Sequence, residues 1–206
     1  MVANQEQVVA SPKRWHVART FFKRAMQQPL LTISVVIIAT VVIVSVAAPW
    51  IAPYEPNQQI LVERLQLPSS THLLGTDHLG RDVLSRLMYA GRFSLTVTTI
   101  ALLLSAILGT ILGAISGRAG GLLDELVMRT VDLMLAFPSE ILALLIASML
   151  KPGALTIVLA VLMTGWTTFA RLARASSLEV STREYVLAAV AIGSRESTII
   201  RRHILP

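Results

Sequence analysis

Long apolar runs without charged residues constrain the fold of this chain most strongly. Residues 30–48 carry no charge and are rich in Val and Ile. A helix of this length can cross a hydrocarbon layer of about 30 Å. The apolar run is longer than the core of a cleaved signal peptide, and the region that precedes it is too long for one. We therefore expect an uncleaved membrane-spanning helix.

Three further runs, at 93–117, about 126–150 and 154–170, also have membrane-spanning length. Hydrophobic residues make up 54% of the chain, and four spans account for this composition. The sequence thus predicts an all-α polytopic membrane protein. The expected order is a cytoplasmic tail at 1–29, a first transmembrane helix at 30–48, an external segment at 49–92, a transmembrane core at 93–170 and a cytoplasmic loop at 171–206.

Basic residues mark the two expected cytoplasmic segments. The tail carries five (Lys13, Arg14, Arg19, Lys23 and Arg24), and the last segment carries six (Arg171, Arg174, Arg183, Arg195, Arg201 and Arg202). Cytoplasmic segments of membrane proteins have such an excess, so both ends are predicted inside. The net charge of +6 therefore indicates membrane orientation and not a nucleic-acid partner. The tail is either an amphipathic helix on the inner leaflet or a solvated extension.

Small residues recur at every fourth position of the second span. They are Ala101, Ser105, Gly109, Gly113 and Gly117. Such a stripe lets another helix approach closely, and close packing drives helix association in lipid. We expect Ser105, Gly109, Gly113 and Gly117 to be packing positions. The sequence does not say whether the partner helix belongs to this chain or to another subunit.

The third span contains Phe137-Pro138 and then Glu140 near its middle. Proline removes a backbone hydrogen bond and kinks a helix, and a carboxylate at mid-membrane costs about 2.5–3.5 kcal/mol on insertion scales. Glu140, with Phe137, is either a translocation-pathway residue that attracts cations or a protonated acid that makes a helix–helix hydrogen bond. Both readings stay open.

The external segment contains the turn sequence G-T-D-H-L-G-R-D. Asp77 is expected to cap, and Asp82 and Arg86 to form an i,i+4 pair. A metal site at His72, Asp77, His78 and Met88 is conceivable. A structural turn is favoured, because the two histidines lack a helical ligand spacing. The chain has no cysteine, which excludes a disulfide and a Cys-based metal site. We expect no metal site and no cofactor.

The last segment has the pattern of two short helices joined at a corner. Ser181 and Glu184 have capping-box spacing, and apolar residues follow at helical spacing up to Ile192. Gly193 is suited to the left-handed conformation that ends a helix. Ser194 is expected to cap the next one.

The order Ala188-Ala189, Gly193, Leu205-Pro206 resembles the EAA loop of permease subunits of bacterial ABC importers. R-H-I-L-P and the external turn sequence resemble the dipeptide/oligopeptide/nickel branch of that family. Leu187 stands where the family usually has Glu. The resemblance implies a MetI-like helix bundle with four of an expected six transmembrane helices, so the chain is expected to lack the last two.

The resemblance further implies a coupling loop formed by Glu184, Ala188, Ala189, Gly193, Leu205 and Pro206. Its expected partners are cytoplasmic ATP-binding subunits, a second permease and an extracytoplasmic binding protein, in a bacterial inner membrane. The expected cargo is a peptide, nickel or a metal complex. The chain has no G-x-x-x-x-G-K-[ST] loop and is expected to be no enzyme. The alternatives are a secondary transporter or channel that uses Glu140 and Asp132 for ion coupling, and a membrane scaffold that only recruits a soluble partner.

Overall fold

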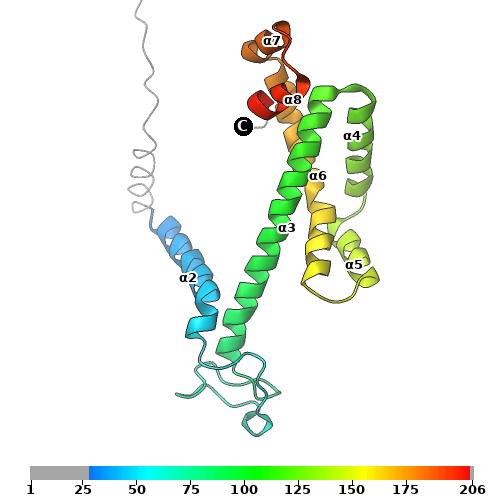
Figure 1. Cartoon of the computed structure of the whole chain (residues 1–206). Helices are drawn as coiled ribbons and strands as arrows, with labels where there is room; N and C mark the ends of the chain where they lie inside the picture. The colour runs from blue at the N-terminus through cyan, green and yellow to red at the C-terminus, as the bar shows by residue number, and fades with distance from the viewer. Residues whose placement is uncertain (1–27, 205–206) are drawn as a thin grey trace, which may run out of the picture. The chain divides into compact units, whose positions relative to one another are not determined.

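The computed structural model describes residues 28–204, which are mainly helical (Figure 1). The predictions for the N-terminal tail and for Leu205 and Pro206 lie outside the described residues. The chain divides into two compact units, Met1–Arg92 and Phe93–Pro206. Helix α3 (Val83–Ala119) begins in the first unit and continues into the second. Each unit is described by itself below.

The first unit contains α2 (Pro29–Ile51), a short 3-10 helix η1 (Leu61–Glu63) and the start of α3. Pro29 stands at the first turn of α2, where its missing N–H costs nothing. Ser45 and Ala48 are buried, and a β-carbon at Gly91 would lie 2.3 Å from Ser45 Oγ. The α2 and α3 backbones are therefore close at this point, and a side chain on Gly91 would separate them.

The second unit continues α3 and adds five helical elements and a terminal π-helix. They are α4 (Gly121–Leu135), α5 (Ser139–Met149), α6 (Ala154–Ser181), α7 (Glu184–Ala191), α8 (Glu196–Ile199) and the π-helix η2 (Ile200–Ile204). Gly120 and Gly121 both have positive φ, +63° and +57°, which is the conformation that the predicted turn between α3 and α4 requires.

Within residues 28–204, three helices are long and apolar enough to cross a membrane: α2 with 23 residues, α3 with 37 and α6 with 28. The pair α4 and α5 forms a fourth candidate, but it is bent by 89°. The third span expected at about 126–150, with a kink at its proline, is thus divided into two helices. Pro138 ends the helix instead of only kinking it, since it lies between α4 and α5 as the residue before Ser139.

Two other helices extend past their expected ends. Helix α3 begins at Val83, inside the segment 49–92 that was expected to be external. Helix α6 continues to Ser181, well into the predicted cytoplasmic loop 171–206. In both cases the added turns are amphipathic or charged, so an apolar-run criterion does not detect them.

Candidate functional site

The small-residue stripe of α3 packs against α6. A β-carbon at Gly109 would lie 2.3 Å from the Trp166 carbonyl oxygen, and one at Gly113 would lie 2.1 Å from the Ala170 carbonyl oxygen. A β-carbon at Gly117 would lie 2.8 Å from the carbonyl oxygen of Arg174, one turn further along α6. The structure thus places the partner helix of these glycines within this chain.

Ser105 continues the same contact with a hydroxyl group. Its Oγ donates to the Ala101 carbonyl at 2.8 Å and lies 3.5 Å from the Val161 carbonyl of α6. A β-carbon at Gly165 would lie 3.1 Å from this Oγ. Small residues on both helices therefore set the close approach of α3 and α6.

A small apolar core joins α4 to this helix pair. Val131 of α4 and Trp166 and Ala170 of α6 are buried together, and Leu112 and Met128 pack against them. Ala170 contributes to this core and also carries the carbonyl that faces Gly113. One turn of α6 is therefore in contact with both α3 and α4.

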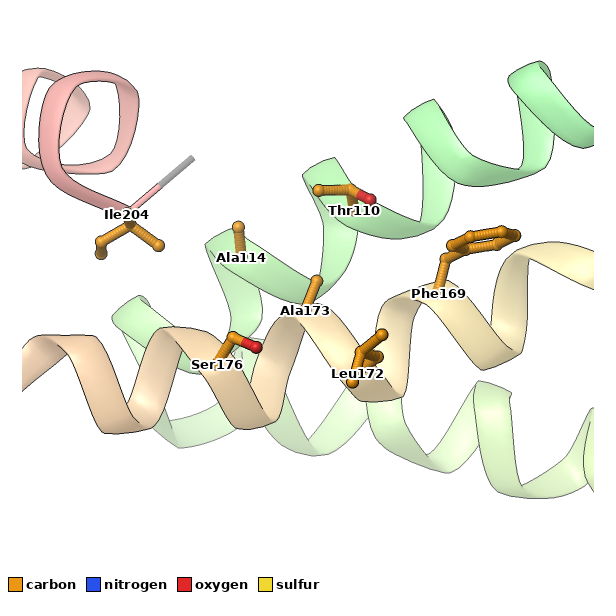
Figure 2. Close-up of a pocket in the computed structure, with 7 residues that line it drawn as sticks. All are labelled: Thr110, Ala114, Phe169, Leu172, Ala173, Ser176 and Ile204. Carbon is orange, nitrogen blue, oxygen red and sulfur yellow. The ribbon is translucent and has the colours of Figure 1, made fainter. Parts of the chain in front are cut away.

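A groove of about 280 Å³ lies between α3, α6 and the end of η2 (Figure 2). It is lined by Thr110, Ala114, Phe169, Leu172, Ala173, Ser176 and Ile204. Ile204 belongs to the segment after the two short helices. Residues of this segment and of both long helices therefore line one groove, and the segment also contacts α6.

Arginines of α6 hold α4 through ion pairs. Arg174 makes two bonds of 2.6 Å to the carboxylate of Asp124, the bidentate geometry of the stronger arginine–carboxylate pairs. Arg171 Nη2 lies 2.8 Å from Asp132 Oδ1. Asp132, one of the two acids that the secondary-transporter alternative uses for ion coupling, is thus paired with an arginine of the same chain. Sequence reasoning named both arginines only as topology markers.

The two short helices after α6 pack on each other through a second core. Val186 and Ala189 of α7 and Ile199 of α8 are buried, with Val180 and Ile204 against them. Gly193 has φ +77°, the left-handed conformation predicted for the corner. The Ser194 amide donates to the Ala189 carbonyl at 3.0 Å, which closes the end of α7.

Both capping predictions for this loop are wrong. Ser181 is the last residue of α6, and the residue that precedes α7 is Arg183. The residue that precedes α8 is Arg195, not Ser194, and neither cap has a side-chain hydrogen bond. The first prediction fails because α6 is longer than expected and includes Ser181, the residue that the capping-box spacing placed before α7.

Helix α7 and the residue that follows it expose large apolar side chains outside this core. Tyr185 is 53% exposed, Leu187 54% and Ile192 82%. Glu184 and Ala188 are exposed as well, whereas Ala189 is buried. We call Tyr185, Leu187 and Ile192 the exposed apolar residues of the α7 segment. Leu187, where the resemblance implies a Glu, is one of these exposed apolar residues.

The break between α4 and α5 presents Phe137 and Glu140. Phe137 is 60% exposed. Glu140 is exposed in the first turn of α5, where a negative charge is favourable to the helix dipole. The structure therefore places both predicted pathway residues at one bend. Their role in a pathway stays a prediction.

In the first unit, the segment before α3 is held by a buried polar cluster. His72 Nδ1 lies 3.0 Å from Asp82 Oδ1, and Asp82 Oδ2 accepts from the Ser85 amide and hydroxyl at 2.7 Å. The Tyr54 ring lies 4.7 Å from the His72 ring. The predicted Asp82–Arg86 pair is wrong, because Asp82 turns to His72 and Ser85, whereas Arg86 lies 3.7 Å from Asp77.

The two acids of this segment have lowered pKa values. Burial raises the pKa of Asp82, but hydrogen bonds from Ser85 and His72 outweigh it and bring the pKa below the ordinary value. The same balance, with bonds from Arg81 and the Leu79 amide, lowers the pKa of Asp77 strongly. Asp77 caps the turn, as predicted, by accepting from the Leu79 and Arg81 amides. In the described residues, no group of three acidic or histidine side chains is arranged to hold a metal ion.

Two family models match the chain. A model described as "Binding-protein-dependent transport system inner membrane component" matches residues 109–206. A second, described as "N-terminal TM domain of oligopeptide transport permease C", matches residues 16–68. The first match covers the α3–α6 contact and the two short helices, and the second covers α2. These are different parts of one kind of permease.

Curated relatives agree with these models. The chain is 41% identical over 184 residues to the metal-staphylopine import system permease protein CntC of Staphylococcus aureus (strain NCTC 8325 / PS 47), covering 89% of this chain and 64% of the relative. It is 34% identical over 185 residues to the dipeptide transport system permease protein DppC of Bacillus subtilis (strain 168), covering 90% and 58%. It is 35% identical over 172 residues to the nickel transport system permease protein NikC of Escherichia coli (strain K12), covering 84% and 62%.

The chain thus spans about three fifths of the length of the relatives it matches. Its long apolar helices make it a multi-pass membrane protein. The resemblance seen in the A-A-x-x-x-G spacing and the external turn is confirmed by both family models and by the relatives. The chain belongs to the inner-membrane permease family of binding-protein-dependent ABC importers, in the branch that contains the dipeptide, oligopeptide and nickel permeases.

Proposed function

We propose that this chain is a transmembrane permease subunit of a bacterial ABC importer, coupled to partner ATPases through the helix pair at 183–202. The observation that carries the proposal is the set of exposed apolar residues of the α7 segment. Tyr185 and Leu187 are exposed on α7 and Ile192 is exposed at its end, and α7 follows the last long apolar helix of the described chain. Exposed apolar patches on an element outside the membrane mark protein–protein contacts.

The construction of the loop supports this role. The inner side of α7 is fixed by the Val186, Ala189 and Ile199 core, so the outer side is presented on a rigid element. Gly193 supplies the corner that directs α8 back toward the long helices. A partner that grips the outer side therefore moves α7 and α8 as one body.

A path for this movement into the membrane is also present. Helix α6 is continuous from Ala154 to Ser181. Val180, in its last turn, packs against the buried core of α7 and α8. Ile204 lines the groove of Figure 2 together with residues of α3 and α6. Displacement of the loop would therefore reach both long helices, which could change access from one side of the membrane to the other.

The cargo and the other partners are part of the proposal. The relatives are named for metal-staphylopine, dipeptide and nickel transport, and we propose a peptide, nickel or a metal complex as cargo. We place the chain in the inner membrane with its N-terminus in the cytoplasm, since basic residues flank that side. A second permease and an extracytoplasmic binding protein would complete the importer. Glu140 and Phe137 would line the pathway.

Reconstitution of the complete complex in liposomes tests the proposal. The full chain would be purified with its ATP-binding subunits and second permease, and uptake of labelled cargo measured with and without binding protein. We expect uptake that requires both ATP and the binding protein. Uptake driven by an ion gradient alone would instead support the secondary-transporter alternative. Binding of the ATP-binding subunits without any flux would support the scaffold alternative.

Single thiols test the coupling contact. The chain has no cysteine, so Ala191→Cys at the end of α7 introduces one reactive group in an exposed position. We expect it to be labelled only from the cytoplasm and to cross-link to an ATP-binding subunit. Ser70→Cys, in the segment between α2 and α3, is the matched control and should be labelled only from outside. Labelling of Ala191→Cys from outside would contradict the assignment.

A further inference from the structure

One ion pair connects the end of α3 to α8. The Arg118 Nε donates to Glu196 Oε2 at 2.7 Å, and Arg118 Nη2 donates to Glu196 Oε1 at 2.9 Å. The Arg118 side chain is largely buried, with 15% of it exposed. Two parallel bonds fix the orientation as well as the distance of the two groups. Figure 1 shows α8 beside this end of α3.

The position of Arg118 makes the pair informative. Arg118 is the second-last residue of α3, and the glycine turn at Gly120 and Gly121 follows it. Both glycines have positive φ, and a β-carbon at either would meet nothing within 4 Å. The turn therefore has open space around it. An arginine at its edge is well placed to shift the end of α3 without steric resistance from the turn.

A second bidentate arginine–carboxylate ion pair holds the other side of the turn. Arg174 of α6 holds Asp124, in the first turn of α4, with two bonds of 2.6 Å. The α3–α4 corner is thus held from α8 by Glu196 and from α6 by Arg174. The apolar contacts described above join α6, α7 and α8, whereas the link from α8 to the end of α3 is this polar pair.

We infer that the Arg118–Glu196 pair is a transmission link, through which movement of the helix pair at 183–202 displaces the α3–α4 corner. The inference rests on the proposed function and adds to it the residues that receive the movement. The hydrogen bonds from Arg118 lower the pKa of Glu196, so the carboxylate stays charged at neutral pH. Arg118 and Glu196 are positioning residues, since neither would touch cargo or nucleotide.

Charge reversal and charge exchange test the link in the reconstituted complex. Glu196→Arg places two cations face to face, and it should lower cargo uptake per ATP hydrolysed about fivefold or more, the lower end of typical coupling between sites. ATP hydrolysis itself should continue. The double variant Arg118→Glu/Glu196→Arg restores opposite charges and should recover uptake per ATP to within about twofold of the wild type.

Glu125→Arg is the matched control. Glu125 pairs with Arg129 at 3.5 Å within α4, and both side chains are largely exposed, so the same charge change there should leave uptake per ATP unaltered. Unchanged coupling in Glu196→Arg would overturn the inference while leaving the proposed function intact. A loss of assembled complex that matches the loss of uptake would assign the pair to stability and also overturn it. Wild-type complex without ATP-dependent uptake would overturn both.

Discussion

Replacement of Gly113 by alanine is the sharpest test of the α3–α6 contact. A β-carbon at this position would lie 2.1 Å from the Ala170 carbonyl oxygen and 2.9 Å from the Ala173 β-carbon. The first neighbour is backbone, so it cannot turn aside as a flexible side chain would. The helices must therefore separate, and α6 also carries Ala170 in the core with α4.

The size of the effect follows from these distances. Real β-carbons essentially never come closer than 3.0 Å to another heavy atom, and the Ala170 carbonyl oxygen would lie 2.1 Å away. Helix α6 must therefore move away from α3 by about 0.9 Å. Overpacking of this kind costs about 1–3 kcal/mol, and the better helix propensity of alanine recovers up to about 1 kcal/mol. Because the neighbour is backbone, we place the cost at the upper end of this range, about 2–3 kcal/mol, so the expected net loss is about 1–2 kcal/mol. For a chain of this length, this loss lowers the unfolding midpoint by about 2–8 °C.

The assay is thermal unfolding of the purified complex in detergent, followed by the fraction that still elutes as intact complex. Gly153→Ala is the control, because Gly153 has extended backbone with φ 163° and a β-carbon there meets nothing within 4 Å. We expect the Gly153→Ala midpoint to equal that of the wild type. Equal midpoints for Gly113→Ala and the wild type would refute the packing argument. The bulkier Gly113→Leu should prevent assembly.

Three further outcomes are expected. Asp82→Asn should weaken the segment before α3 by about 1–3 kcal/mol, because a buried charged hydrogen-bond acceptor is lost. In the wild type the pKa of folded Asp82 is lowered, so this stabilisation is present above the ordinary Asp pKa of about 4 and is lost as the pH falls through the folded pKa. The rate of limited proteolysis between α2 and α3 measures the effect of the substitution and the effect of pH. A wild-type cleavage rate that does not depend on pH would contradict the pH argument. Gly193→Val should reduce uptake per ATP while expression stays normal, because a β-branched residue is strained at φ +77°; uptake assays would show unchanged coupling if the corner is not needed. Glu140→Gln should weaken uptake of cationic cargo more than that of neutral cargo, and equal loss of both would favour a packing role.

The membrane-spanning helices could largely be predicted from the sequence, because the cost of burying charge in lipid makes apolar runs visible. Helix α2 shows this most clearly: the expected 30–48 became Pro29–Ile51. The extensions of α3 to Val83 and of α6 to Ser181 could not be predicted in this way. Their added turns lie beyond the apolar runs and depend on tertiary contacts, such as the buried Ser85 and the buried Ser177, whose hydroxyl donates to the Ala114 carbonyl.

The candidate site was predictable in parts. The spacing around Gly193 identified the corner of the helix pair, since its φ requirement is local. The ion pairs were not predictable, because the sequence gives the charged residues but not which of them the fold brings into contact. Asp82 was assigned to Arg86 by helical spacing, yet a histidine ten residues away occupies it. Arg118 and Glu196 are 78 residues apart, and no local signal joins them.

The right-angled join between α4 and α5 has a consequence for the environment of the protein. The backbone from Ala136 to Pro138 lies outside both helices. The Ala136 amide donates to the Asp132 carbonyl and the Pro138 carbonyl accepts from the Ile141 and Leu142 amides, but the Phe137 amide and carbonyl have no hydrogen-bond partner within the described residues. Hydrocarbon tails cannot satisfy such groups. Wherever this join lies at membrane depth, a neighbouring polypeptide or a hydrated passage must adjoin it, so the surroundings of Phe137 are not bulk lipid.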